Sequence, residues 1–598
     1  MNDLITELVG FHEGVNHEAY NIFGAHADSG GNVTFRVWAP HASGVHLVGD
    51  FNDWNISATP MVQVADGVYE ITLNDIPKYS NYKYAIHHAD GNVRMMADPY
   101  AFYAETSGGT ASKVWFLDEG FSWSDASYLK GRADSDSLHS PMNIYEAHPA
   151  TWRRLSDGGY YDYTRLAEEL IPYVKEMGYT HLELMPLSEY PRDDSSGYDP
   201  TGFFAVTARY GTPEGFMKLV DAAHKEGLGV ILDWVPSRFA SDDWALIRYD
   251  GDVLYEDPTR GNSDGWGTSV FDYSKPQVRS FLISGAMLFL KEYHVDALRI
   301  GLLSEMQYME AEGFLKELTE AVSLEVPGAM IFGSGSAMGQ LVTAAPCEGG
   351  LGFDYMWNSG WARDMESYLR TDPYFRKQQH NRLTFPMSHA FSEKHIVIVS
   401  HEEVSGGRKS LMEKLPGEYD IKFDGYRGFL LYMMSQPGKK LTFMGTEFGQ
   451  FDEWNHARPL DWNLLEYDRH RQLEEYVKDL NHFYLEHPEL WQEDDSWKGF
   501  QWINADDAEN NILVYRRIAT DGRQLIFVVN FAPVERKYYR IEVMEDRPYR
   551  EIFNSDETKY GGTGVTNPGD IIPVTSQGSR RGQYIELSLG PLGAVAIC

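Results

Sequence analysis

Eight short apolar runs that alternate with longer stretches of helical character constrain the fold of this chain more than any other feature. They lie between about residues 140 and 480 and have the sequences NIYEAH, HLELMPL, GVILDWV, ALRIG, AMIFG, LGFDYMW, HIVIVSH and KLTFMGTE. A parallel strand that is buried on both faces needs a crossover helix to bring the chain back to the same end of the sheet. Eight such units predict a closed (β/α)8 barrel of the TIM type.

Strand-like sequence flanks this segment on both sides. Toward the N-terminus, short alternating segments such as NVTFRVWAP and GVHLVGDFND are separated by Gly, Asn and Asp turns, which predicts a small β-sandwich. Toward the C-terminus, ILVYRRI and QLIFVVNFA predict an all-β domain. The predicted organisation is a helical arm (1–20), a β-sandwich module of the carbohydrate-binding kind (21–115), the barrel (116–490) and a C-terminal β-domain (491–598).

Charge and cysteine content narrow the functional classes. The formal net charge is −36, from 88 acidic and 52 basic residues with no run of Lys or Arg, so we expect no binding to nucleic acid. Only Cys347 and Cys598 occur in 598 residues, which argues against a disulfide-stabilised secreted protein. The N-terminus has no signal-peptide pattern and no apolar run is long enough for a membrane span. We expect a soluble cytoplasmic protein.

In a barrel of this type the chemistry lies at the C-terminal ends of the strands. A lone Asp or Arg at such an end can equally be an ion pair that closes the barrel rim, but several polar residues together favour a functional site. The residues at these ends are Asp233 on the third run, Arg299 and Gly301 on the fourth, Gly333 on the fifth, and His401 and Glu402 on the seventh.

Several longer segments carry a resemblance to a known family. They include GYDPTGFFAVTARYGTPEGF, GVILDWVPSRF, VDALRIG, SHEEVSGGRKSLMEKLPGEY and TFMGTEFGQFDEWNHARPLDW. With these segments the chain resembles the bacterial glycogen branching enzymes of the α-amylase family of glycoside hydrolases, from about residue 20 to the end. The resemblance implies cleavage of an α-1,4-glucan and transfer of the cut chain to a 6-hydroxyl, with α-glucan as the ligand.

The catalytic positions that the resemblance implies are altered in this chain. A retaining transfer needs a carboxylate nucleophile and a carboxylic acid about 5 Å apart. The family's nucleophilic aspartate corresponds to Gly301, its acid glutamate to Gly333 within MIFGSGSAMG, and its third carboxylate, an aspartate, to Glu402. Loss of general acid catalysis alone costs about 100 to 10,000-fold in rate. We therefore expect a protein without transferase turnover.

Three further departures weaken the family pattern. Arg238 and Gly406 stand where the family has histidines, and Ser196 stands where it has a tryptophan. A glycine at a strand end can also mark a bulge, but two at both catalytic positions make coincidence a poor explanation.

Other residues match the family. Tyr198, Asp233, Arg299 and His401 correspond to the residues that surround the sugar at the cleavage point, so binding of a glucan chain is still expected.

Three carboxylates near the altered positions, Glu305, Asp354 and Glu403, offer an alternative in which a rearranged site is active. Helix and strand geometry places them a turn away or facing elsewhere, so we expect structural roles for them.

Tryptophans mark a second candidate ligand site in the N-terminal module. We expect Trp38 in the core of the sandwich, whereas Trp54 in GDFNDWN is equally consistent with a core residue and with a glucan-stacking platform. No metal-ligand spacing or phosphate loop is present, so no metal and no cofactor is expected.

The sequence therefore predicts an α-glucan-binding pseudoenzyme, which could also pair with an active enzyme of glycogen metabolism. The alternatives are an active branching enzyme and an interaction scaffold that binds no glucan.

Overall fold

The computed structural model describes residues 2–106, 108–117, 121–260, 267–308, 311–335, 341–575 and 582–598. The chain forms two compact units. The first unit comprises residues 1–134, 148–172 and 183–354, and the second comprises residues 135–147, 173–182 and 355–598.

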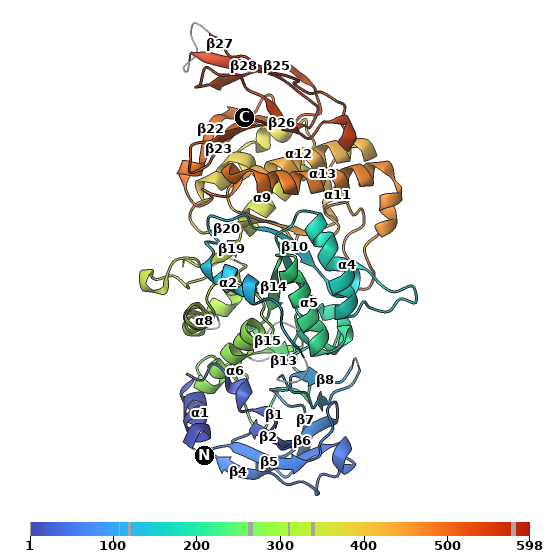
Figure 1. Cartoon of the computed structure of the whole chain (residues 1–598), viewed down its shortest axis with the longest axis vertical. Coiled ribbons are helices and arrows are strands. Elements are labelled where there is room, and N and C mark those ends of the chain that lie inside the picture. The colour runs from blue at the N-terminus through green and yellow to red at the C-terminus, as the bar shows by residue number, and fades with distance from the viewer. Residues whose placement is uncertain are drawn as a thin grey trace. The chain divides into compact units, whose positions relative to one another are not determined.

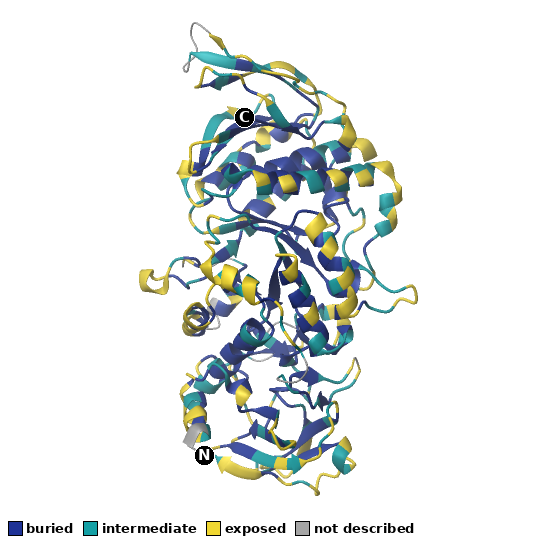
Figure 2. Ribbon diagram, in the orientation of Figure 1, coloured by how far each residue is buried: buried dark blue, intermediate teal, exposed yellow. Residues whose placement is uncertain are grey.

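Eight parallel strands, hydrogen-bonded in chain order, close into the predicted barrel (Figure 1). Figure 2 shows these strands as buried, which explains why their sequences are almost continuously apolar. Their carboxyl ends meet at one end of the barrel, where polar side chains can gather. The strands are β10 (Asn143–Ala147), β11 (His181–Leu184), β14 (Gly229–Trp234), β17 (Ala297–Ile300), β18 (Met330–Gly333), β19 (Tyr355–Trp357), β20 (His395–Val399) and β21 (Lys439–Phe443).

Helices connect most of these strands, as the alternating pattern predicts. The connection from β18 to β19 is different, because its described part carries only a 3-10 turn, Pro346–Glu348. Gly349 follows with a left-handed φ of 89°, which ends a helix rather than extending one. No helix within the described ranges is both long and apolar enough to cross a membrane. The connecting helices are α4 (Tyr163–Glu176), α5 (Pro213–Lys225), α6 (Pro276–Met287), α8 (Glu312–Glu325), α9 (Ser359–Arg370) and α12 (Tyr419–Ser435).

The N-terminal module belongs to the first unit and consists of two antiparallel sheets. Helix α1 (Asn2–Glu13) precedes it, and the turn after α1 is tied to α6, because Ser280 Oγ donates a hydrogen bond to the carbonyl of Asn16. One sheet has the order β1-β2-β5-β4 and the other β3-β6-β9-β8, with β7 paired to β6. The strands are β1 (Gly24–Ala27), β2 (Asn32–Trp38), β3 (Gly44–Gly49), β4 (Val62–Ala65), β5 (Val68–Asn74), β6 (Asn81–His87), β7 (Val93–Met96), β8 (Tyr103–Ala104) and β9 (Ser112–Lys113).

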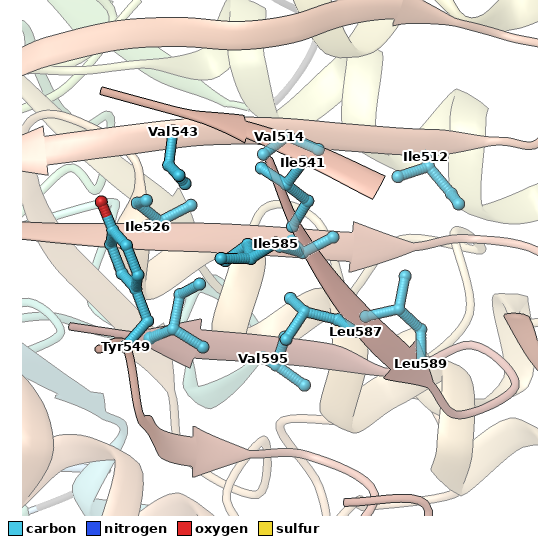
Figure 3. Packing of buried hydrophobic residues seen from close by; sticks show 12 residues of the cluster. Ile512, Val514, Ile526, Ile541, Val543, Tyr549, Ile585, Leu587, Leu589 and Val595 are labelled. Atoms are coloured by element: carbon cyan, nitrogen blue, oxygen red, sulfur yellow. The ribbon is translucent and has the colours of Figure 1, made fainter. Parts of the chain in front are cut away.

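The C-terminal β-domain follows α13 (Asp468–Glu486) in the second unit. A five-stranded sheet, β22-β23-β24-β29-β26, and a three-stranded sheet, β25-β28-β27, bury apolar side chains against each other (Figure 3). The strands are β22 (Phe500–Asp507), β23 (Ile512–Ile518), β24 (Gln524–Asn530), β25 (Arg536–Val543), β26 (Glu551–Asn554), β27 (Val574–Thr575), β28 (Gln583–Leu589) and β29 (Ala594–Ile597).

Candidate functional site

Asp233 and Arg299 form the buried centre of a hydrogen-bonded group in the first unit. They lie opposite each other on the paired strands β14 and β17. Arg299 Nη1 donates to Asp233 Oδ2 at 2.9 Å, and the Tyr198 hydroxyl donates to the same oxygen at 2.5 Å. Asp233 and Arg299 are only 1% and 2% exposed, so the guanidinium compensates the buried carboxylate. The structure thus brings Tyr198, Asp233 and Arg299 together.

Arg238 helps to hold the loop that carries Tyr198. It begins β15 (Arg238–Ala240), and its Nε donates to the carbonyl oxygen of Tyr198 at 3.3 Å. The same atom lies 3.7 Å from Asp199, whose carboxylate also accepts from Arg192 at 3.0 Å. Ser196, in the same loop, is buried and has a left-handed φ of 51°. The loop is therefore fixed by arginines.

Gly301 and Gly333 lie at the ends of neighbouring strands. Gly301 directly follows β17, and Gly333 ends β18 opposite Ile300. A β-carbon added to Gly301 would lie 3.5 Å from Arg299 Nη1 and 3.7 Å from Ser334 Oγ, which are ordinary contacts. Neither glycine has a group that can attack a sugar or donate a proton. Of the MIFGSGSAMG stretch that places Gly333 in the family pattern, residues 336–339 lie outside the described residues.

His401 forms a second polar group, in the second unit. It lies two residues beyond the end of β20, and its Nδ1 pairs with a carboxylate oxygen of Glu146 from β10. The backbone N–H of His401 donates to the other oxygen of Glu146 at 3.0 Å. One oxygen of a completely buried glutamate therefore orients the imidazole, and the other holds the backbone of His401.

Glu402 and Glu403 follow His401 but differ in environment. Glu403 is buried, and its carboxylate accepts hydrogen bonds from the backbone N–H and the hydroxyl of Ser400 at 2.8 and 2.7 Å. Burial raises the pKa of Glu403 above its usual value. Glu402 is half-buried, and its backbone N–H donates to Ser400 Oγ at 3.2 Å. Glu403 thus closes a turn.

The remaining positions singled out in the sequence have separate surroundings. Asp354 Oδ2 accepts from the backbone N–H of Ile331 at 2.7 Å, so this carboxylate aligns β18. Glu305 is exposed on the short helix α7 (Leu303–Tyr308). Gly406 has a left-handed φ of 68° and no atom within 4 Å of an added β-carbon, so backbone conformation explains a glycine there.

The two tryptophans of the N-terminal module differ in exposure. Trp38 is 6% exposed and packs edge-on against Phe11 and Tyr255 at ring distances of 5.4 and 6.0 Å, as expected for a core residue. Trp54 is 36% exposed, and its Nε1 donates to Asp50 at 3.1 Å. The core alternative for Trp54 is therefore excluded.

Sequence reasoning missed Glu146, which orients His401, and Glu183. Both glutamates are completely buried in barrel strands, β10 and β11. The signal was present, because NIYEAH and HLELMPL each place one glutamate inside an otherwise apolar run. A charged residue inside a buried strand needs a partner and so deserves inspection.

Three protein-family models match the parts of this architecture. Carbohydrate-binding module 48 (isoamylase N-terminal domain) matches residues 22–101, the α-amylase catalytic domain matches 154–248, and the α-amylase C-terminal all-β domain matches 502–598. Among solved structures, a putative α-amylase from Salmonella typhimurium superposes with a TM-score of 0.71 at 17% identity, covering 96% of this chain and 99% of that one. A Bacillus subtilis pullulanase in complex with maltose superposes with a TM-score of 0.73 at 20% sequence identity. The match covers 96% of this chain and 85% of the pullulanase. The fold is thus that of the α-amylase class.

Full-length relatives define the family more narrowly. The 1,4-alpha-glucan branching enzyme GlgB of Bacillus caldolyticus is 43% identical over 98% of this chain and 90% of its own length. The GlgB of Nitrosomonas eutropha is 41% identical over 99% of this chain and 84% of its own length. The GlgB of Halothermothrix orenii is also 41% identical, over 98% of this chain and 97% of its own length. The chain belongs to the 1,4-alpha-glucan branching enzyme family.

Proposed function

We propose that this member of the family binds α-glucan without transferring it. The observation that carries the proposal is the pair of glycines, Gly301 and Gly333, at the ends of adjacent strands. A retaining mechanism requires a nucleophile and an acid on opposite sides of the scissile bond. A glycine offers neither, and a water molecule in its place would be a far weaker nucleophile and acid.

The polar groups that remain support binding. Tyr198, Asp233 and Arg299 form one hydrogen-bonded group, and His401 is oriented by Glu146 in another. Such fixed donors and acceptors suit sugar hydroxyls because they need no reorganisation on binding. In this proposal the protein acts in the cytoplasm, where it docks on glycogen or pairs with an active enzyme of glycogen metabolism. Trp54 supplies a further surface for the glucan.

The rival proposal, an active enzyme with rearranged carboxylates, has less support. Asp354 is bonded to the backbone of β18 and Glu403 to Ser400, so each would have to break a structural hydrogen bond to act on a sugar. Glu305 lies exposed on α7. Glu402 keeps a charge but is one methylene longer than aspartate, a displacement of roughly 1 Å that positioned chemistry tolerates badly.

A branching assay tests the proposal directly. The purified protein is incubated with amylose, the product is debranched, and α-1,6 linkages are counted against a no-enzyme blank. We expect no branches above the blank. A rate within about a hundredfold of an ordinary branching enzyme would refute the proposal, because loss of the acid alone costs about that much or more.

Affinity electrophoresis in gels that contain glycogen tests binding. We expect retarded migration of the wild-type protein. Tyr198→Phe removes one hydroxyl next to Asp233, so it should raise the dissociation constant about 3- to 10-fold. Tyr374→Phe is the matched control, since Tyr374 is 80% exposed in the second unit and should change nothing. Unretarded wild-type protein would favour the scaffold alternative instead.

A further inference from the structure

Apolar side chains occupy the space in front of Gly333. A β-carbon added there would lie 2.7 Å from Leu303 Cδ1, 3.2 Å from Phe353 Cδ1 and 3.3 Å from Val342 Cγ1. Non-bonded carbon atoms normally stay about 3.5–4.0 Å apart, so even a methyl group conflicts with its neighbours. At Gly301, by contrast, the nearest atom is 3.5 Å away. The two glycines therefore differ, because one leaves room and the other does not.

Backbone hydrogen bonds hold these apolar residues in place. The N–H of Leu303 donates to the carbonyl of Ser334 at 3.1 Å, which fixes Leu303 beside the end of β18. The N–H of Phe353 donates to the carbonyl of Val342 at 3.1 Å. Leu303, Val342 and Phe353 are each at most 1% exposed. We call these three residues the β18 plug.

We infer that Leu303 is the residue that excludes an acid from this site. The inference rests on the proposed lack of transfer chemistry and deepens it. Position 333 lacks a carboxylate, and the side chains of the β18 plug occupy the space that a carboxylate would need. Leu303 could rotate to admit a methyl group, but a glutamate adds four more heavy atoms at a point where Phe353 and Val342 already lie within 3.3 Å of the β-carbon. An acid can therefore return to position 333 only if the β18 plug becomes smaller, first at Leu303, whose Cδ1 is the nearest atom.

A double-mutant cycle on thermal unfolding of the full chain tests the β18 plug. Gly333→Glu should lower the unfolding midpoint of the transition that it affects by about 3 °C or more, as overpacking does in a tight core. Leu303→Ala should also lower it, because it leaves a cavity. The double variant should lose much less than the sum of the two single losses in unfolding midpoint, since the cavity left by Leu303→Ala makes room for the new glutamate.

Matched controls separate the β18 plug from general effects of the same substitutions. Gly313→Glu places the same side chain on α8 at an exposed glycine with no atom within 4 Å, so it should leave the midpoint unchanged or raise it. Leu219→Ala creates a cavity under α5 and should not relieve Gly333→Glu. A wild-type midpoint for Gly333→Glu, or additive losses in the cycle, would overturn the inference. If Gly333→Glu does not fold, the same cycle is run with Gly333→Ser, whose hydroxyl extends beyond the methyl group that Leu303 can admit.

Activity supplies a second readout that distinguishes the two proposals. Branch formation by the wild-type protein would refute the proposed function. The double-mutant unfolding cycle would still test whether the β18 plug excludes a side chain at position 333. Branch formation by Gly301→Asp/Gly333→Glu with Leu303 intact would overturn the β18 plug. We expect that variant to make no branches.

Discussion

Arg299 lies 3.5 Å from the point where a side chain on Gly301 would begin. We therefore expect Gly301→Asp to fold with an unfolding midpoint within about 2 °C of wild type, since the new carboxylate has room and a cation beside it. It should not restore branching, because the acid at position 333 is still absent. Calorimetry and the branching assay check the two statements.

The same substitution at Gly197 provides the contrast. Gly197 has a left-handed φ of 90°, and an added β-carbon would lie 2.5 Å from the carbonyl oxygen of Pro186. Gly197→Asp should therefore lower the midpoint strongly or prevent folding. Equal losses at Gly197 and Gly301 would show that the space beside Arg299 is not available.

Single residues also show where sequence reasoning stops. Gly301 could be singled out from the sequence, because the family resemblance implies a carboxylate two residues after Arg299 and a glycine is there instead. The packing against Gly333 could not, since Leu303, Val342 and Phe353 come from separate stretches and meet only in the folded chain. Local patterns give the positions of side chains along an element but not their long-range neighbours.

At the level of elements, a buried ionic cluster joins segments at the end of the barrel away from the site. His224 of α5 lies 2.8 Å from Asp125 and 3.0 Å from Asp296, next to β17. Arg132 of α2 (Ala126–Asp134) pairs with Asp296 at 3.0 Å, and His294 pairs with Asp125 at 2.8 Å. Burial opposes the charge on His224, but Asp296 and then Asp125 raise its pKa above the usual value.

This cluster predicts a dependence of stability on pH. The pKa of His224 is raised in the folded state. Its contribution to folding stability is therefore complete below the unfolded-state pKa of about 6.5, and it is lost as the pH rises through the folded-state pKa. The midpoint difference between wild type and His224→Gln should therefore be large at about pH 6 and should shrink toward pH 9. His139→Gln, which alters an exposed pair with Asp136, is the control and should show no such trend. A constant difference between wild type and His224→Gln would contradict the assignment.

The elements themselves were largely predictable. Every one of the eight apolar runs coincides with a barrel strand to within one residue at its start or overlaps most of it, because a strand covered on both faces must be apolar almost throughout. The prediction of a helix between β18 and β19 was wrong for the described residues, because Pro346 and Gly349 confine the 3-10 turn to three residues. Periodicity identifies strands and helices well, but a proline and a glycine can override a repeating pattern.

For the whole molecule, the net charge of −36 affects charged and uncharged ligands differently. So large a charge keeps molecules apart and repels polyanions. An α-glucan is uncharged, so its binding neither gains from nor is opposed by this field. The polar groups of the site, such as Asp233 with Arg299, are paired and buried, and salt screens buried pairs only weakly.

We therefore predict that glycogen binding is almost independent of ionic strength. The dissociation constant should change less than about twofold between roughly 0.05 and 0.5 M NaCl, because no counterions are released when a neutral chain binds. A short DNA duplex is the polyanion control and should not bind at either salt concentration. Affinity electrophoresis at both concentrations measures the effect. A tenfold loss of glycogen binding at high salt would contradict the prediction, because it would mean that charge attraction carries the interaction.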